Sequence, residues 1–470
     1  MNSKGVVNLK MPSHAAHIIF FSIVGSILNI SSYSSVSPLI LVLVLLTALN
    51  FLLIFTPLGG NPELIAFNYI FSICWMMSGI AAIYANQFGD ESQLFSDAGG
   101  FYLLSSSGNE WQGLNEIREI SEGSLAIYIW SYFYDFLYMI GFERGRYIGV
   151  YLNICAVSLS GLIGIKLIRL IYGNDLYRFN KFKLIMGWCG IFWLFASIHL
   201  RDSLVLLSVT SLLYPWLKFL RNPDFGFNFL LIFLVSVTVS YLLFFLRGEF
   251  IFVPPAIVLA GILSMTYGYQ GRKQKRNLIY VLIFFGILLA AVAFYNYYDT
   301  VITMLKSSQE GYFSVARDSS QNSLAMRLII DQPLPIRIIF GSVYLFVFPI
   351  PFWVGFQTES AYSLFKSLYV LYLYALVPML FVSLRTIIKN KFTRTPQILF
   401  LLLISIGFLI GCAVTSLETR HYGAFFIAVI IFSITTDMRN SYNWNLYKLA
   451  AQGFIIFIMI VHVAWILLKS

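Results

Sequence analysis

The sequence predicts an all-α polytopic integral membrane protein, and two observations carry that prediction. Of the 470 residues, 59% are hydrophobic and only 11% are charged, whereas about a quarter of the residues of a soluble domain are charged. Apolar runs of about 20 residues, the length that crosses a bilayer as a helix, recur from His17 to Leu468. A soluble enzyme with one membrane anchor is therefore excluded, and residues 1–470 are expected to form a single transmembrane domain.

About 13 spans are predicted from the apolar runs. The first run follows Lys4 and Lys10 without a small-residue cleavage site, so we expect an uncleaved first span. Segment 115–141 is interpreted as an amphipathic helix in the interface, and segment 336–357 as re-entrant or kinked because it contains two prolines. The predicted spans are 15–31, 37–56, 63–86, 147–171, 184–200, 203–220, 226–246, 250–269, 277–298, 363–386, 396–416, 421–437 and 448–468.

Basic clusters set the predicted orientation, because cytoplasmic loops are enriched in lysine and arginine. If segment 115–141 or segment 336–357 crossed the membrane fully, a strongly basic loop would lie outside. Both segments are therefore assigned to the outer side. Two long outer loops result: residues 87–141, with the amphipathic helix, and residues 299–361, with the kinked segment. The outer side is then acidic, although acids were not used to set the orientation. The clusters assigned to the cytoplasm, together with the N-terminus, are 166–183, 218–221, 272–276, 385–394 and 439–448.

Several chemistries are not indicated by this sequence. The net charge is +10, yet no nucleic-acid motif or long basic run accompanies it, and no P-loop indicates ATP. The four cysteines, Cys74, Cys155, Cys189 and Cys412, all lie in apolar runs and are interpreted as small core residues. No two histidines and an acid have metal-ligand spacing. We therefore expect no cofactor, no metal and no nucleic-acid partner.

Three polar clusters interrupt the apolar sequence at predicted outer span ends. They are His199-Leu-Arg201-Asp202-Ser203, Arg247-Gly-Glu249 and Glu418-Thr-Arg420-His421-Tyr422. Ionisable groups are costly in a bilayer and mark functional sites when they face a cavity. In the simplest alternative, each arginine pairs with the neighbouring acid and only stabilises a helical hairpin. Three clusters at one level, from hairpins distant in sequence, favour a shared polar cavity instead.

Arginine in such a cavity indicates a polyanionic ligand, because the guanidinium fork stays charged and matches the geometry of phosphate oxygens. At the outer leaflet, a lipid diphosphate is the obvious candidate. The predicted diphosphate ligands are Arg201, Arg247 and Arg420, with Arg327 of the second outer loop as a fourth. The supporting residues are His199, Asp202, Glu418 and Tyr422.

Three residues near the predicted phosphate site could accept a proton and are the candidates for a catalytic base. In order of preference, with little difference between them, they are Glu249, Asp97 and His421. Asp97 lies in the small-residue turn 95–102 at the start of the first outer loop, and an acid among glycines marks turns in many proteins. His421 has Glu418 on the preceding turn and Arg420 beside it, although a histidine at a span end is as often buried without a chemical role.

The chain resembles the polytopic O-antigen (oligosaccharide repeat-unit) polymerases of bacterial envelopes, relatives of GT-C-type glycosyltransferases. The resemblance rests on the layout of spans, on the turn from Ser96-Asp97-Ala98 to Tyr102, and on the arginine clusters at outer span ends. It implies transfer of an undecaprenyl-diphosphate-linked glycan onto an incoming lipid-linked repeat unit, at the periplasmic face of the bacterial inner membrane. A lipid-linked donor and acceptor, membrane lipid and a chain-length regulator protein are the implied partners. The sequence departs from the ligase branch in having no single dominant outer loop with an obvious catalytic histidine.

Two other functions stay open at this point. A GT-C glycosyltransferase that takes one sugar from undecaprenyl phosphate would use the acid of the first outer loop, Asp97, as its base. A flippase or transporter for lipid-linked oligosaccharide would show internal repeats and broken helices near the bilayer midplane, whereas the charges here cluster at one surface. Loss of the polysaccharide ladder with retention of single-unit glycolipid would distinguish a polymerase from a flippase.

Overall fold

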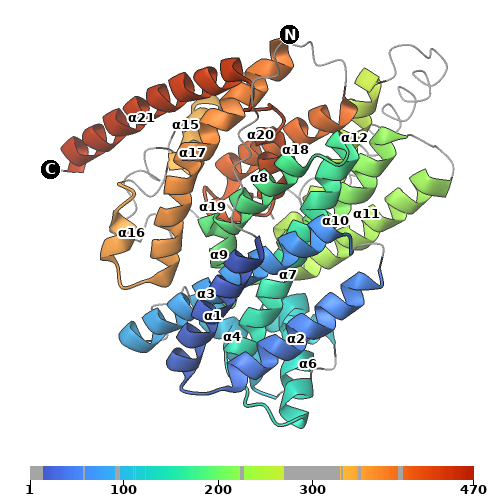
Figure 1. The fold of residues 1–470 in the computed structure, drawn as a ribbon, viewed down its shortest axis with the longest axis vertical. Helices are drawn as coiled ribbons and strands as arrows, with labels where there is room; N and C mark the ends of the chain where they lie inside the picture. The colour runs from blue at the N-terminus through green and yellow to red at the C-terminus, as the bar shows by residue number, and fades with distance from the viewer. Residues whose placement is uncertain are drawn as a thin grey trace.

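The computed structural model describes residues 14–56, 59–89, 96–108, 111, 113–121, 123–222, 227–268, 329, 332–347, 351–389 and 395–469. These residues are helical or irregular, with no strand among them (Figure 1). Ten helical segments in this part of the chain are long and apolar enough to cross a membrane. The predicted all-α, multi-pass architecture is therefore confirmed. The segments are α1 (His14–Tyr33), α2 (Ser37–Ile54), α3 (Asn61–Phe88), α7 (Tyr147–Tyr172), α10 (Asp202–Arg221), α11 (Phe227–Leu246), η2 with α12 (Gly248–Phe252, Val253–Gly268), α17 (Ala361–Lys389), α18 (Pro396–Thr415) and α21 (Ser441–Lys469).

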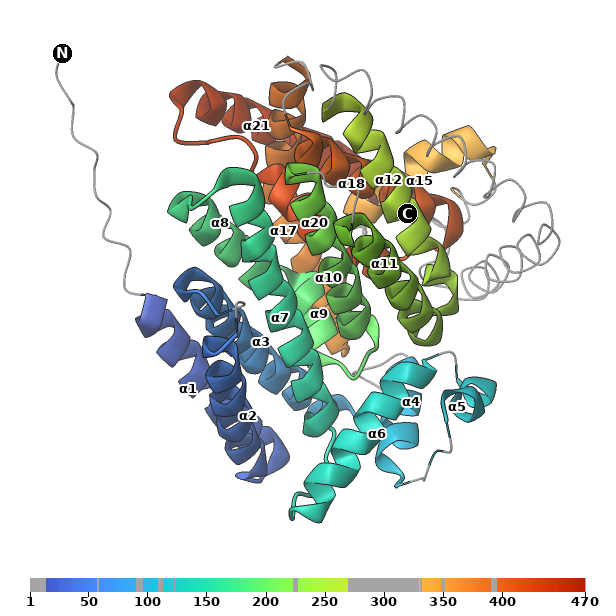
Figure 2. The same cartoon turned by 90° about the vertical axis from the view of Figure 1, so that its right-hand side faces the viewer.

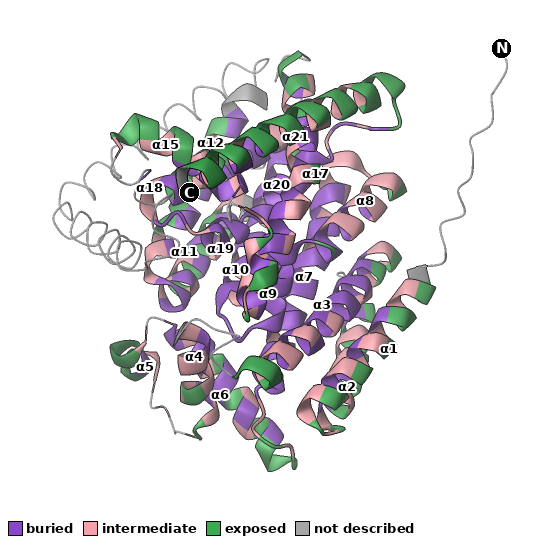
Figure 3. Ribbon diagram, turned by 90° about the vertical axis from the view of Figure 1, so that its left-hand side faces the viewer, coloured by how far each residue is buried: buried purple, intermediate pink, exposed green. Residues whose placement is uncertain are grey.

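The centre of the bundle is formed by short helices that are apolar on every side, as buried helices must be. All residues of α9 (Gly190–Ser197) and of α20 (Phe426–Ser433) are buried. Figure 3 shows burial concentrated in α3, α7, α9, α10 and α20, whereas α21 is largely exposed. An exposed apolar helix in a membrane protein faces lipid, so α21 lies at the periphery of the bundle.

Two predicted spans are not single helices. Segment 184–200 is divided between α8 (Leu176–Gly187) and α9, and segment 421–437 between α19 (Thr419–Gly423) and α20. At the first break the chain leaves the helix at Trp188 and Cys189, and α9 then crosses α17 so closely that a Cβ on Gly190 would lie 2.6 Å from the Phe365 carbonyl oxygen. The predicted span 277–298 lies outside the described residues.

Three helices of the predicted first outer loop gather at one end of the bundle. They are α4 (Ser96–Ser106), α5 (Leu114–Ile120) and α6 (Ser124–Met139), and Figure 2 shows them beyond the ends of α7, α9 and α10. The outward face of α6 exposes Tyr132, Phe136 and Met139, while Trp130 and Tyr134 are buried against the bundle. Aromatic residues with one apolar and one polar end suit the membrane interface. We call this region the α4–α6 end.

The second predicted outer loop is described only in part. Two helices of it are α15 (Leu334–Val347) and α16 (Val354–Gln357). Residues 351–353, directly before α16, are not helical; they lie within segment 336–357, where a kinked or re-entrant segment is predicted. Pro349, one of the two prolines on which that prediction rests, lies outside the described residues.

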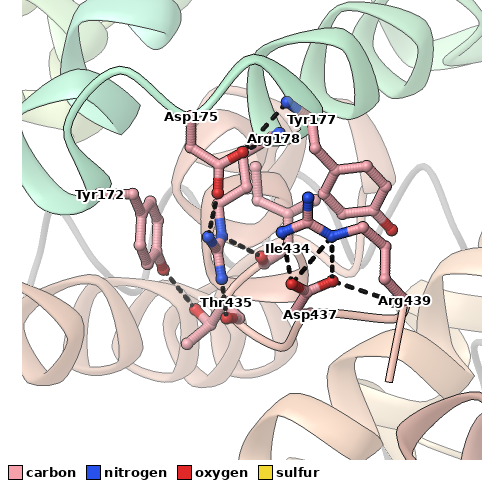
Figure 4. A network of polar contacts seen from close by, with 8 residues as sticks. All are labelled: Tyr172, Asp175, Tyr177, Arg178, Ile434, Thr435, Asp437 and Arg439. Carbon is pink, nitrogen blue, oxygen red and sulfur yellow. Dashed lines mark hydrogen bonds and ion pairs between the residues drawn. The ribbon is translucent and has the colours of Figure 1, made fainter. Parts of the chain in front are cut away.

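At the opposite end, two loops that the basic clusters assign to one side of the membrane contact each other. Arg178 of α8 donates hydrogen bonds to the carbonyl oxygens of Ile434 (3.2 Å) and Thr435 (3.0 Å) and is ion-paired with Asp175 (Figure 4). The Tyr172 hydroxyl donates to the Thr435 hydroxyl at 2.8 Å. This end is separated from the α4–α6 end by α7, whose 26 residues extend about 40 Å. The two basic loops therefore lie at the same end of the bundle, and the side of the membrane that this end faces stays a prediction.

Candidate functional site

The first polar cluster lies where α9 turns into α10. Asn153 of α7 donates from its amide nitrogen to the carbonyl oxygens of Ile198 and Leu200, each at 3.0 Å, and accepts a hydrogen bond from the Ser203 hydroxyl at 2.7 Å. These bonds satisfy the extended backbone between the two helices and fix the start of α10. Asp202 therefore occupies the first turn of α10, where the helix dipole favours a negative charge.

The second cluster meets the first through a buried ion pair. Arg247, at the end of α11, places its Nη1 3.0 Å from the Oδ1 of Asp202, and the two side chains are 2% and 4% exposed. The guanidinium also lies 5.6 Å from the ring centre of Phe250. The ion pair of Arg247 thus joins two hairpins. The alternative in which this arginine only pairs with its sequence neighbour Glu249 does not describe the contact that is found.

The third cluster is likewise connected to other helices. Arg420 of α19 places its Nη2 3.1 Å from the Oδ2 of Asp97 on α4. Glu418 accepts hydrogen bonds from the Tyr362 hydroxyl at 2.8 Å and from the Lys366 ammonium at 2.9 Å, both on α17. Burial raises the pKa of the Glu418 carboxyl, but the charges of Lys366 and Arg420 outweigh it and lower this pKa to about 2. Glu418 is therefore ionised, and its Oε1 is bound by two side chains of α17.

His421 marks the point where the cations come together. Its Nδ1 lies 2.8 Å from the Ser416 hydroxyl, and the ring is buried edge-on against Phe250. Burial holds its pKa well below the usual value, and the positive charges of Arg247, Arg420, Arg201 and Lys366 lower it further, in that order. An imidazole at which four cations act stays neutral. All three predicted arginines therefore lie near enough to one residue for their charges to act on it.

Arg201 lies directly before α10, beneath the helices of the α4–α6 end. Its guanidinium carbon lies 5.4 Å from the ring centre of Phe101 on α4. A Cβ on Gly123, just before α6, would lie 3.3 Å from the Cδ of Arg201. The side chain is therefore held between the start of α10 and the α4–α6 end, which cover it.

His199 lies in an aromatic cage beside the cation cluster. Its ring centre is 4.2 Å from that of Trp130, and the Tyr134 hydroxyl lies 3.5 Å from its Nε2. The ring is fully buried, and a Cβ on Gly149 of α7 would lie 1.9 Å from the same nitrogen. Burial and the nearby charge of Arg146 lower the pKa of His199 to about 3, so the side chain is neutral. His199 lies in the α9–α10 turn and packs against α6 and α7, so it connects these three elements.

Of the remaining predicted residues, Tyr422 and Glu249 are described by the structure and Arg327 is not. Tyr422 is buried, and its hydroxyl donates to the Ser405 carbonyl oxygen at 3.2 Å, which connects α19 to α18. Glu249 is half-buried in η2, two residues beyond Arg247. Arg327 lies outside the described residues, so its predicted role stays a prediction.

Two residues of the site were missed by the sequence analysis. Lys366 lies inside the predicted span 363–386 and Tyr362 directly before it, and neither belongs to the three polar clusters. A single lysine within an apolar run was the signal available, because an ionisable residue inside a span is costly unless it is paired. Its partner, Glu418, lies 52 positions further along the chain, in the third cluster.

The arrangement is suited to stabilising negative charge. Fixed cations in a buried, water-poor site act more strongly on a developing anion than they would in water, and need no reorganisation. No group of three or more histidine, cysteine or acidic side chains in the described part of the chain is placed to hold a metal ion.

Comparison of the chain with protein families, curated proteins and solved structures finds no match.

Proposed function

We propose that this protein is a glycosyltransferase of the O-antigen polymerase type. In this proposal it joins undecaprenyl-diphosphate-linked oligosaccharide repeat units at the periplasmic face of the bacterial inner membrane. The observation that supports the proposal is that Arg247, Arg420 and Lys366 are held in ion pairs between helices, and that their charges and that of Arg201 all act on His421. A cluster of fixed cations suits a leaving group that carries two phosphates and departs with increased negative charge.

The proposed reaction is a direct displacement at the anomeric carbon. The oxygen of an acceptor sugar hydroxyl forms a bond to the anomeric carbon of the donor glycan, and the bond from that carbon to the diphosphate oxygen breaks. The electron pair leaves with the undecaprenyl diphosphate, which the arginines stabilise, and the hydroxyl proton passes to a protein base. No oxidant, reductant or further reactant is needed.

The contacts in the site bear on which residue takes the proton. Glu418 is held ionised by Lys366 and Tyr362, so it is a weak base with a structural role. His421 is neutral because cations surround it. A bound diphosphate would offset those cations and raise the pKa of His421 toward its ordinary value, so this imidazole becomes a stronger base when the site is loaded. Glu249 and Asp97 remain the carboxylate candidates.

The test is arginine replacement in cells, read on a lipopolysaccharide gel. Arg201→Ala, Arg247→Ala and Arg420→Ala are each expected to abolish the polysaccharide ladder and to retain single-unit glycolipid. The matched control is Arg144→Ala, which removes an ion pair with Asp135 at the same end of the molecule but outside the cation cluster. Immunoblots of membranes show whether each variant accumulates. A normal ladder in all three variants at normal abundance would refute the shared phosphate site.

One observation favours a second function, a GT-C transferase with an undecaprenyl-phosphate sugar donor. Asp97, the base in that alternative, lies against Arg420 and is the most exposed carboxylate among the ion pairs of the site. Under this alternative, Asp97→Asn abolishes all transfer and the product carries one added sugar. Under the polymerase proposal, the arginine variants are the most impaired and the product is a ladder of repeat units.

A further inference from the structure

The cations of the site are enclosed. Arg201, Arg247 and Arg420 are all buried, each below one tenth of its full exposure. A lipid-linked diphosphate is large, and its phosphate oxygens must come within hydrogen-bond distance of a guanidinium to be held by it. Some element that covers the arginines must therefore move before such a ligand can bind them.

The carboxylates of the ion pairs are not equally able to leave. Asp202 is 4% exposed and is bound within the bundle, while Glu418 is held by both Lys366 and Tyr362. Asp97 is 41% exposed. Partly exposed ion pairs contribute little to stability, whereas breaking a buried one is costly. Asp97 is thus the acid that is lost from its partner at the lowest cost.

The helix that carries Asp97 is attached to the bundle partly through the cations of the site. Helix α4 packs mainly against α6, within the α4–α6 end. Its contacts with the rest of the bundle include the Asp97–Arg420 ion pair, Phe101 against Arg201, and Tyr102, whose ring lies beside His199. Arg144 and Arg146 attach the other end of α4, through the Ser106 carbonyl oxygen and Tyr102, so the contacts with Arg420 and Arg201 are those that hold its Asp97 end on the cations.

We propose that the carboxylate of Asp97 occupies, on Arg420, the position that a phosphate group of the lipid-linked substrate takes, and that substrate binding displaces it. Displacement releases α4 from α19 and exposes Arg201 and Arg420 to the ligand. This inference rests on the proposed function, because it assigns the displacing anion to the diphosphate of that substrate. It makes Asp97 a residue that controls access, in contrast to the catalytic base of the sequence prediction.

A native thiol near Arg247 offers a measure of access to the cations of the site. Cys412 of α18 is buried, and Arg247 and Glu249 lie close enough for their charges to act on it. The full chain, with Cys74, Cys155 and Cys189 replaced by alanine, is purified into nanodiscs, and the rate at which a polar maleimide labels Cys412 is measured. Inorganic diphosphate, added up to millimolar concentration, serves as the probe anion. Inorganic sulfate at the same ionic strength tests for a salt effect.

The expected result is that Asp97→Asn increases the labelling rate without any anion, by about two- to five-fold, the factor expected for a partly exposed ion pair. Diphosphate is expected to increase the rate in the unchanged background and to add nothing in Arg420→Ala. The matched control is Asp135→Asn, since Asp135 is 40% exposed and also ion-paired, but with Arg144 and not across the site. This variant should leave the rate unchanged.

Three outcomes separate this inference from the proposed function. Equal rates for Asp97→Asn, Asp135→Asn and the unchanged background would overturn the displacement, even if diphosphate binds. Faster labelling of Asp97→Asn, with no measurable diphosphate binding to any variant, would retain the opening and overturn the diphosphate site. Loss of transfer in Asp97→Asn with an unchanged labelling rate would overturn displacement in favour of Asp97 as the catalytic base.

Discussion

The Arg247–Asp202 pair gives a quantitative test of the site, because stability and activity respond differently to its removal. Both side chains are almost fully buried. Arg247→Ala leaves the Asp202 carboxylate in the interior without its cation, which is expected to lower the free energy of unfolding by about 3–5 kcal/mol. Replacing both residues together, as Arg247→Met with Asp202→Leu, removes both charges and is expected to restore stability to within about 1 kcal/mol of the unchanged protein.

The assay is reversible unfolding of the purified protein in mixed micelles, combined with the polysaccharide gel in cells. The control pair is Asp135–Arg144, which is 40% and 28% exposed, so Arg144→Ala should cost at most about 1 kcal/mol. The double variant should be stable and inactive, because it lacks one of the proposed diphosphate ligands. A stable double variant with a normal ladder would refute a role for Arg247 in phosphate binding, and a loss below 1 kcal/mol in Arg247→Ala would refute its burial.

Three further predictions follow from charges and placement. The pKa of His199 is about 3 in the folded protein and 6.5 ordinarily, so the unfolded state binds the proton first and stability falls below pH 6.5. His199→Phe should remove about 2 kcal/mol of that loss at pH 5, measured by unfolding at pH 7.5 and 5. The pKa of Glu418 is about 2, against an ordinary value of 4.5. The ionised carboxylate therefore contributes about 3 kcal/mol to the free energy of unfolding above pH 4.5, and this contribution is lost as the pH falls toward 2. Glu418→Gln should make the free energy of unfolding less dependent on pH in this range. For orientation, Met139→Cys at the α4–α6 end should react with an impermeant maleimide in spheroplasts, and Arg439→Cys at the opposite end only after permeabilisation. The reverse labelling pattern would contradict the predicted topology.

The membrane architecture could be predicted because it depends on local composition. An apolar run of sufficient length is expected to cross the bilayer whatever its neighbours are. The interruption at Trp188 and Cys189 could not be predicted in the same way. It lies within an apolar stretch in which all residues are compatible with a helix, and the reason for the break is tertiary: α9 must pass close to the backbone of α17 at Gly190.

The same holds for the candidate site: its polar residues could be predicted from the sequence, and the contacts between them could not. Arginine, histidine and acid clusters at span ends stand out from an apolar background, so the sequence could indicate which residues to examine. The partners could not be inferred. Arg247 is ion-paired with Asp202, Arg420 with Asp97, and Glu418 with Lys366. The residues of each pair are 45, 323 and 52 positions apart, and such pairs form only when separate helices pack together.

Pairing between elements has a consequence for how the site is assembled. A charge that is buried in an apolar bundle is tolerated only when its partner is in place. Here the partners come from α10 and α11, from α17 and the α18–α19 turn, and from α4 and α19, so correct packing of these helices is the condition for neutralising every charge. The same contacts then leave one pair, Asp97–Arg420, at the exposed margin. Three cations of the site are paired with acids when it is closed, and departure of Asp97 would free one of them, Arg420. On the proposed function, this pairing is what lets the site stay stable in the membrane without a ligand and still bind a diphosphate.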